Sequence, residues 1–156
     1  MTAGTTLILG VGNPLQGDDG LGVRAAEMLA ERELPPGVRV EEIGTPGLGL
    51  ANWLEAESRV IIVDAIHMGE RPGAWRRFGP DEVRLIASGA VLSLHEPGLA
   101  EGLALAQALD RLPEEIVFYG IEPAGCEAGR EPNPAVSEAL LALVEAILAD
   151  IWKRAV

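Results

Sequence analysis

Two adjacent carboxylates, Asp18 and Asp19, end a glycine-rich loop near the N-terminus, directly after an apolar segment at residues 6–11. A nucleotide-binding loop uses glycine N–H groups to approach a phosphate at a helix N-terminus. Acidic side chains at that place would repel the phosphate. The loop is therefore suited to a cation.

Two further candidate ligands follow later in the sequence. Asp64 terminates a continuous apolar run at residues 59–66, and His95 precedes a helix start near Pro97. In an open parallel sheet, ligands gather beyond the carboxyl ends of the strands. Asp19, Asp64 and His95 would together suit a divalent first-row metal and leave coordination positions open. His67 is a weaker fourth candidate.

Each acid also has a structural interpretation. Asp18 or Asp19 could cap the helix that begins at Gly20, which would contribute about 1 kcal/mol. Asp64 could be a turn residue or a hydrogen-bond anchor, although a carboxylate directly after an apolar run is costly unless it is paired or metal-bound.

Cys126 is a poor candidate for a nucleophile. No histidine is adjacent to it in the sequence, and the neighbouring Glu122 and Glu127 would disfavour a thiolate. The sequence also lacks a His-Glu-x-x-His helix and a recognisable Ser-His-Asp arrangement.

Alternating strand and helix patterns must position these residues. The patterns predict strands at residues 6–11, 38–43, 59–66, 73–78 and 116–121, helices at 21–32, 48–56, 97–112 and 135–152, and a short excursion at 80–86. This order predicts a single α/β domain over residues 1–156, built as a three-layer α/β/α sandwich. Its sheet is expected to be five-stranded and mostly parallel, with an antiparallel edge strand.

Composition excludes several classes of partner. The net charge of −12 disfavours nucleic acid and anionic membranes. A single cysteine rules out an internal disulfide and a zinc site of several thiolates. No apolar run approaches the ~20 residues that span a bilayer, and the N-terminus has no basic region. We therefore expect a cytoplasmic, monomeric protein.

Several motifs together resemble the hydrogenase maturation endopeptidases, and the resemblance covers nearly the whole chain. These motifs are GVGNPLQGDDGLG at residues 10–22, GTPG at 44–47, VDA at 63–65, SLHEPGL at 93–99, YGIEP at 119–123 and PAV at 134–136. Some relatives carry glutamate where this chain has Asp19.

The resemblance implies a protease that removes a C-terminal extension from the large-subunit precursor of a nickel-iron hydrogenase after nickel insertion. It implies Asp19, Asp64 and His95 as nickel ligands, with Asp18 or Asp64 as a candidate base, so that all four are catalytic candidates. A ligand set of two carboxylates and one imidazole would bind nickel weakly, so we expect the substrate to supply the metal. No nucleotide cofactor is expected.

Two other functions stay open on the sequence. A non-catalytic nickel-binding chaperone would use the same ligands without cleaving a peptide bond. A dinucleotide-binding oxidoreductase is less consistent, because Gly10 and Gly12 are followed by Leu15 where the third glycine of the fingerprint should fall.

Overall fold

The computed structural model describes residues 4–15, 17–54, 58–88, 93–94, 99–125 and 133–155. Its strands are β1 (Thr6–Val11), β2 (Val38–Gly44), β3 (Arg59–His67), β4 (Trp75–Phe78), β5 (Ser93–Leu94) and β6 (Glu115–Ile121). Its α-helices are α1 (Leu21–Ala30), α2 (Leu50–Leu54), α3 (Pro80–Ala87), α4 (Leu99–Ala108) and α5 (Pro134–Ala155), with 3-10 turns η1 (Gly17–Gly20) and η2 (Gly47–Gly49).

The main sheet has the strand order β2-β1-β3-β6-β4. Its first four strands run parallel, and β4 pairs antiparallel with β6 at the edge. The predicted five-stranded, mostly parallel sheet with an antiparallel edge strand is therefore confirmed. The short strand β5 was not predicted, because two residues carry no periodic signal; it pairs antiparallel with Ile66 and His67 at the end of β3.

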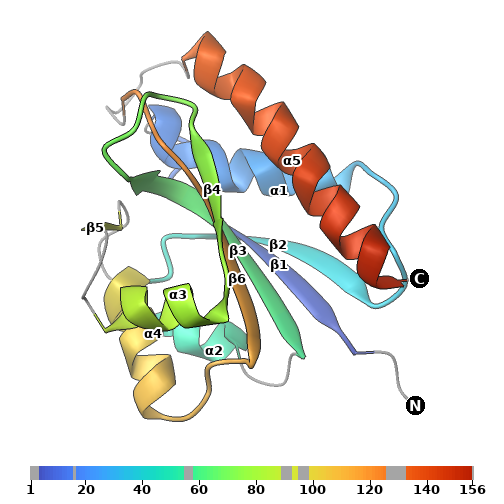
Figure 1. Cartoon of the computed structure of the whole chain (residues 1–156), viewed down its shortest axis with the longest axis vertical. Helices are drawn as coiled ribbons and strands as arrows, with labels where there is room; N and C mark the ends of the chain where they lie inside the picture. The colour runs from blue at the N-terminus through green and yellow to red at the C-terminus, as the bar shows by residue number, and fades with distance from the viewer. Residues whose placement is uncertain are drawn as a thin grey trace.

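Helices cover both faces of the sheet, as Figure 1 shows, with α1 and α5 on one face and α2, α3 and α4 on the other. Alternate residues of β3 enter the two cores. Ile62 and Ile66 pack in the core beneath α2, α3 and α4, whereas Ile61 and Val63 pack in the core beneath α1 and α5. Burial on both faces explains the continuous apolar run that marks a central parallel strand.

The excursion expected at residues 80–86 is a helix, α3. It starts with Pro80 in its first turn, and the Glu82 side chain accepts a hydrogen bond from the Gly79 N–H at 3.4 Å. Val83, Ile86 and Ala87 form its buried face at helical spacing. The eight-residue pattern was too short to distinguish from a loop by sequence alone.

The helix expected at residues 97–112 ends earlier, at Ala108. Asp110 has a φ of 56°, and the Arg111 N–H returns to the Ala106 carbonyl at 2.8 Å. This left-handed residue and its backbone bond are typical of a helix C-terminus. Within the described part of the chain, no helix is long and apolar enough to cross a bilayer.

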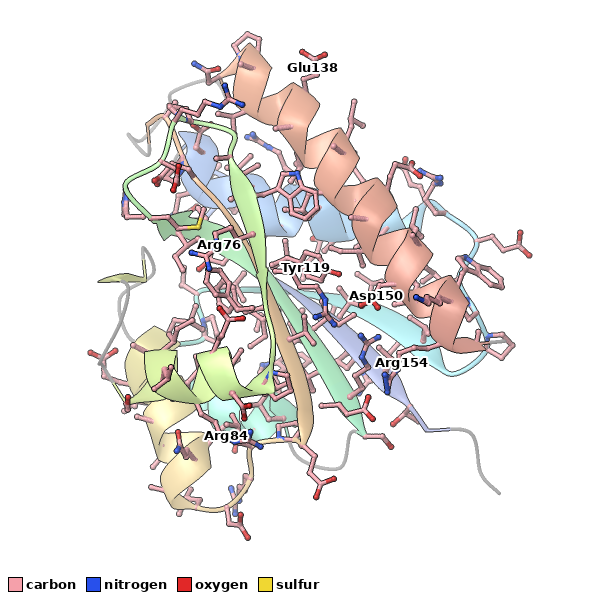
Figure 2. All side chains as sticks on the ribbon, in the orientation of Figure 1. Arg76, Arg84, Tyr119, Glu138, Asp150 and Arg154 are labelled. Carbon is pink, nitrogen blue, oxygen red and sulfur yellow. The ribbon has the colours of Figure 1, made fainter. Side chains whose placement is uncertain are left out.

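A polar cluster beneath α5 joins that helix to the sheet. Asp150 accepts hydrogen bonds from Arg59 at 2.7 Å and from the Tyr119 hydroxyl at 3.3 Å, both at Oδ2. Arg77 Nη2 lies 3.7 Å from the same oxygen. Figure 2 shows Tyr119 and Asp150 between the sheet and α5. One carboxylate thus connects α5 with β3, β4 and β6.

Burial of Tyr119 generates a prediction for alkaline pH. Burial raises the pKa of its phenol above the ordinary value of 10.0, and the Asp150 charge raises it further. Because the folded state holds this proton more tightly, the free energy of unfolding should fall as pH rises from about 10 through the folded-state pKa.

Tyr119 is the single tyrosine of the chain, so tyrosinate absorbance isolates its titration. We expect a folded midpoint above that of the denatured chain, and an Asp150→Asn variant with a lower midpoint than the wild type. A folded midpoint equal to that of the denatured chain would contradict the burial that the structure assigns to this ring.

Candidate functional site

Gly12 lies where the loop after β1 packs against the carboxyl end of β3. It has a φ of +133°, and its N–H donates to the Gly44 carbonyl at 2.8 Å. A Cβ added to Gly12 would lie 1.9 Å from the Asp19 carbonyl oxygen and 3.6 Å from Asp64 Oδ1. The backbone of η1 and the Asp64 side chain therefore converge on the same side of this glycine.

Gly22 allows α1 to approach the same edge of the sheet. A Cβ there would lie 2.2 Å from the carbonyl oxygens of both Val11 and Val63. Asp64 follows Val63 directly, and Asp19 lies in the turn that leads into α1. The first turn of α1 therefore packs directly against the carboxyl ends of β1 and β3.

Asp19 and Asp64 are both almost fully buried, at 2% and 0% exposure. The Asn13 N–H donates to Asp19 Oδ2 at 3.0 Å, and the Ala65 N–H donates to Asp64 Oδ1 at 2.8 Å. The two buried carboxylates lie at the same edge of the sheet, and each accepts a backbone N–H group. Their oxygen donors are suited to a divalent metal.

His95, the third predicted ligand, lies outside the described residues. The strand that ends just before it in the sequence, β5, pairs with Ile66 and His67, shortly after Asp64. The chain therefore reaches this edge of the sheet one residue before His95. Among the described residues, no group of three or more histidine, cysteine and acidic side chains has the geometry of a metal site.

The Asp18 carboxylate connects η1 to backbone groups near the other end of the chain. It accepts N–H bonds from Ala124 at 2.6 Å, Gly125 at 3.1 Å and Asn133 at 3.3 Å. The Asp18 N–H also donates to the Gly125 carbonyl at 2.8 Å. Because both carboxylate oxygens hold backbone groups, this geometry favours a positioning role for Asp18.

The capping alternative for the two acids is wrong. The N-cap of α1 is Gly20, and no side-chain hydrogen bond caps this helix. The carboxylates of Asp18 and Asp19 accept the backbone N–H groups of other segments instead, among them those of Ala124 and Asn13.

Glu122 is a feature of this edge that the sequence interpretation missed. It is 4% exposed, and its Oε1 accepts the N–H groups of Met68 at 3.0 Å and Glu70 at 2.7 Å. His67 Nδ1 lies 3.8 Å from Glu122 Oε2, with the His67 side chain 54% exposed. An acid directly after an apolar strand is the signal that could have identified it. The role of His67 as a fourth ligand stays a prediction, and Cys126 lies outside the described residues.

The contacts of Asp18 predict a large effect on stability. Asp18→Ala would leave three partly buried N–H groups without their carboxylate, so we expect the free energy of unfolding to fall by about 3 kcal/mol. Chemical denaturation measures the change. Asp81→Ala is the matched control, because Asp81 is fully exposed in its pair with Arg84 and should change stability far less than Asp18→Ala does. Equal effects of the two substitutions would contradict the anchoring role.

The sequence matches the family model described as hydrogenase maturation protease over residues 23–150. The hydrogenase expression/formation protein HupM of Azotobacter chroococcum is 38% identical over 149 residues, covering 92% of this chain and 71% of the relative. The hydrogenase 2 maturation protease of Escherichia coli is 30% identical over 152 residues, covering 96% and 92%.

Solved structures of similar proteins share the fold. The hydrogenase maturating endopeptidase HybD from Escherichia coli superposes with a TM-score of 0.83 at 30% identity, over 96% of this chain and 93% of that one. The [NiFe] hydrogenase maturation protease HybD from Thermococcus kodakarensis gives 0.76 at 35% identity, over 94% and 99%. The chain therefore belongs to the hydrogenase maturation protease family, and it is a maturation endopeptidase.

Proposed function

We propose that this peptidase removes the C-terminal extension from the large-subunit precursor of a nickel-iron hydrogenase after nickel insertion. The proposal includes recognition of the nickel that the precursor carries. The observation that carries it is the convergence of the Asp19 backbone and the Asp64 side chain on Gly12, which places two buried carboxylates at one edge of the sheet. The names of the relatives and of the solved structures support hydrogenase maturation as the process served.

The residues that would hold the nickel of the substrate are Asp19, Asp64 and His95. Carboxylate oxygens and an imidazole nitrogen form a mixed donor set that accepts a divalent first-row metal. Three protein ligands leave positions for groups that the substrate brings. A site of this kind suits a metal that arrives with the precursor and leaves with the product.

The side chains of this protein divide the remaining work. Asp18 fixes η1 and so positions Asp19, while Gly12 keeps the space beside Asp64 free of a side chain. Nickel held there would polarise the scissile carbonyl or acidify a water. A buried carboxylate at the site takes the proton of the attacking water. The oxygen of the water bonds to the carbonyl carbon, the carbon–nitrogen bond breaks, and the proton held by the carboxylate passes to the released amine.

Family membership favours this function over the two alternatives. The nickel-chaperone alternative would keep the same ligands, but the Escherichia coli relative is named a maturation protease and the similar solved structure an endopeptidase. An oxidoreductase would require a phosphate near η1, where Asp18 and Asp19 are both buried.

Incubation with a nickel-loaded, unprocessed large subunit tests the proposal. We expect the wild type to release a C-terminal peptide, detected as a loss of mass from the subunit. Asp19→Asn, Asp64→Asn and His95→Ala should each slow release by roughly a thousandfold, because the metal contributes several kcal/mol to catalysis. Asp81→Asn, a fully exposed control, should process the precursor at the wild-type rate.

Unfolding curves must show that each slow variant is folded under the conditions of the assay. Full activity of a folded Asp64→Asn or His95→Ala variant would refute the assigned ligands. The nickel-free precursor provides a separate comparison and should remain uncut. Equal processing of both precursors would contradict nickel recognition while leaving the peptidase activity intact.

A further inference from the structure

Two leucines are exposed at the edge of the sheet where Asp19 and Asp64 lie. Leu15 is 76% exposed and Leu48 is 60% exposed, the highest values among the large apolar side chains of the described residues. Single exposed leucines are ordinary, but leucines exposed on adjacent loops beside a candidate site are typical of a contact surface. We call these two residues the leucine rim.

The two leucines extend from neighbouring strands at the same edge. Val11 of β1 pairs with Gly44 of β2 at the carboxyl ends of both strands. Leu15 lies four residues after Val11, and Leu48 lies four residues after Gly44. The Gly12 N–H joins the two loops through the Gly44 carbonyl at 2.8 Å. The rim is therefore next to the glycine on which Asp19 and Asp64 converge.

Leu15 is tied directly to the candidate ligand. Its N–H donates to Asn13 Oδ1 at 3.0 Å, and the Asn13 N–H donates to Asp19 Oδ2 at 3.0 Å. One asparagine thus fixes the position of the exposed leucine relative to the buried carboxylate.

Leu48 is also held by the fold. It belongs to η2, where the Gly49 N–H donates to the Pro46 carbonyl at 2.9 Å. The turn packs on α4 so closely that a Cβ on Gly102 would lie 2.4 Å from the Gly47 carbonyl oxygen. A turn fixed in this way presents its leucine at low entropic cost to a binding partner.

We propose that the leucine rim binds the substrate polypeptide next to its scissile bond, burying apolar side chains of an extended segment. This inference rests on the proposed function. A substrate polypeptide that is cleaved beside Asp19 and Asp64 must extend beyond them across the adjoining surface of this protein. A second copy of this protein on the rim would cover the same surface and compete with the precursor.

The negative charge near this edge indicates which kind of polypeptide segment the leucine rim can bind. Glu41 and Glu42 lie near the carboxyl end of β2, which finishes at Gly44, and the whole chain has a net charge of −12. An acidic segment would be repelled, so the segment that the rim binds is apolar and neutral or basic.

Steady-state processing of the nickel-loaded precursor tests the rim. Leu15→Asp and Leu48→Asp should each raise KM about tenfold with kcat changed less than about twofold, because they remove binding that is uniform along the reaction. Leu15→Met and Leu48→Met keep an apolar side chain and should therefore raise KM less than the aspartate variants do. Leu141→Asp is the matched control, since Leu141 is 55% exposed on α5 and should leave KM unchanged.

Wild-type processing with unchanged KM in both aspartate variants would overturn the rim while leaving the proposed function intact. Failure of the wild type to process the precursor would overturn both proposals. Sedimentation adds a further test. A wild-type dimer that Leu15→Asp and Leu48→Asp convert to monomer would assign the rim to self-association and overturn the proposal.

Discussion

The site depends on how closely the first helix approaches the ends of the two central strands. At Gly22, a single added carbon would collide with the carbonyl oxygens of Val11 and Val63, both at 2.2 Å. At Gly12, the corresponding carbon would lie 1.9 Å from the Asp19 carbonyl oxygen. Side chains at these positions would push η1 and α1 away from the sheet and separate Asp19 from Asp64. The glycines of the loop therefore allow close backbone packing beside two buried carboxylates, which is a different use from the cradling of a phosphate.

The three acids at this edge use their charges differently. Both carboxylate oxygens of Asp18 accept hydrogen bonds from backbone N–H groups, those of Ala124, Gly125 and Asn133. Its charge therefore stabilises the fold between segments that are far apart in the sequence. Asp19 and Asp64 are buried at the same edge, and each accepts a backbone N–H group, from Asn13 and Ala65 respectively. The anchoring of Asp18 also holds η1, and with it Asp19, in place at this edge of the sheet.

The sequence predicted the elements whose signals are local. The continuous apolar segments of β1 and β3 gave their bounds to within one residue, and the edge position of β4 followed from the alternation of Trp75 with the exposed pair Arg76 and Arg77. The sequence could also predict that Asp19 and Asp64 share an edge, because parallel strands end on the same side. It could not predict the partners of Asp18, which lie 106 to 115 residues away and are backbone groups without a side-chain signature. The position of Glu122 directly after an apolar strand was a usable signal, but its partners, the N–H groups of Met68 and Glu70, have no side-chain signature.

If both proposals hold, Asn13 connects the two contacts by which the substrate is recognised, the nickel ligand Asp19 and the polypeptide-binding Leu15. Its N–H holds the Asp19 carboxylate, and its side-chain oxygen holds the N–H of Leu15. A site with few hard ligands binds nickel weakly, and two exposed leucines bind a polypeptide weakly. When the metal and the polypeptide belong to one molecule, the second contact becomes intramolecular and the two affinities reinforce each other. Mature subunit lacks the extension, and nickel-free precursor lacks the metal, so each offers one contact where the competent substrate offers two. Because each contact alone is weak, only the nickel-loaded, unprocessed precursor binds well. The protein can therefore distinguish this precursor from the mature subunit and from the nickel-free precursor.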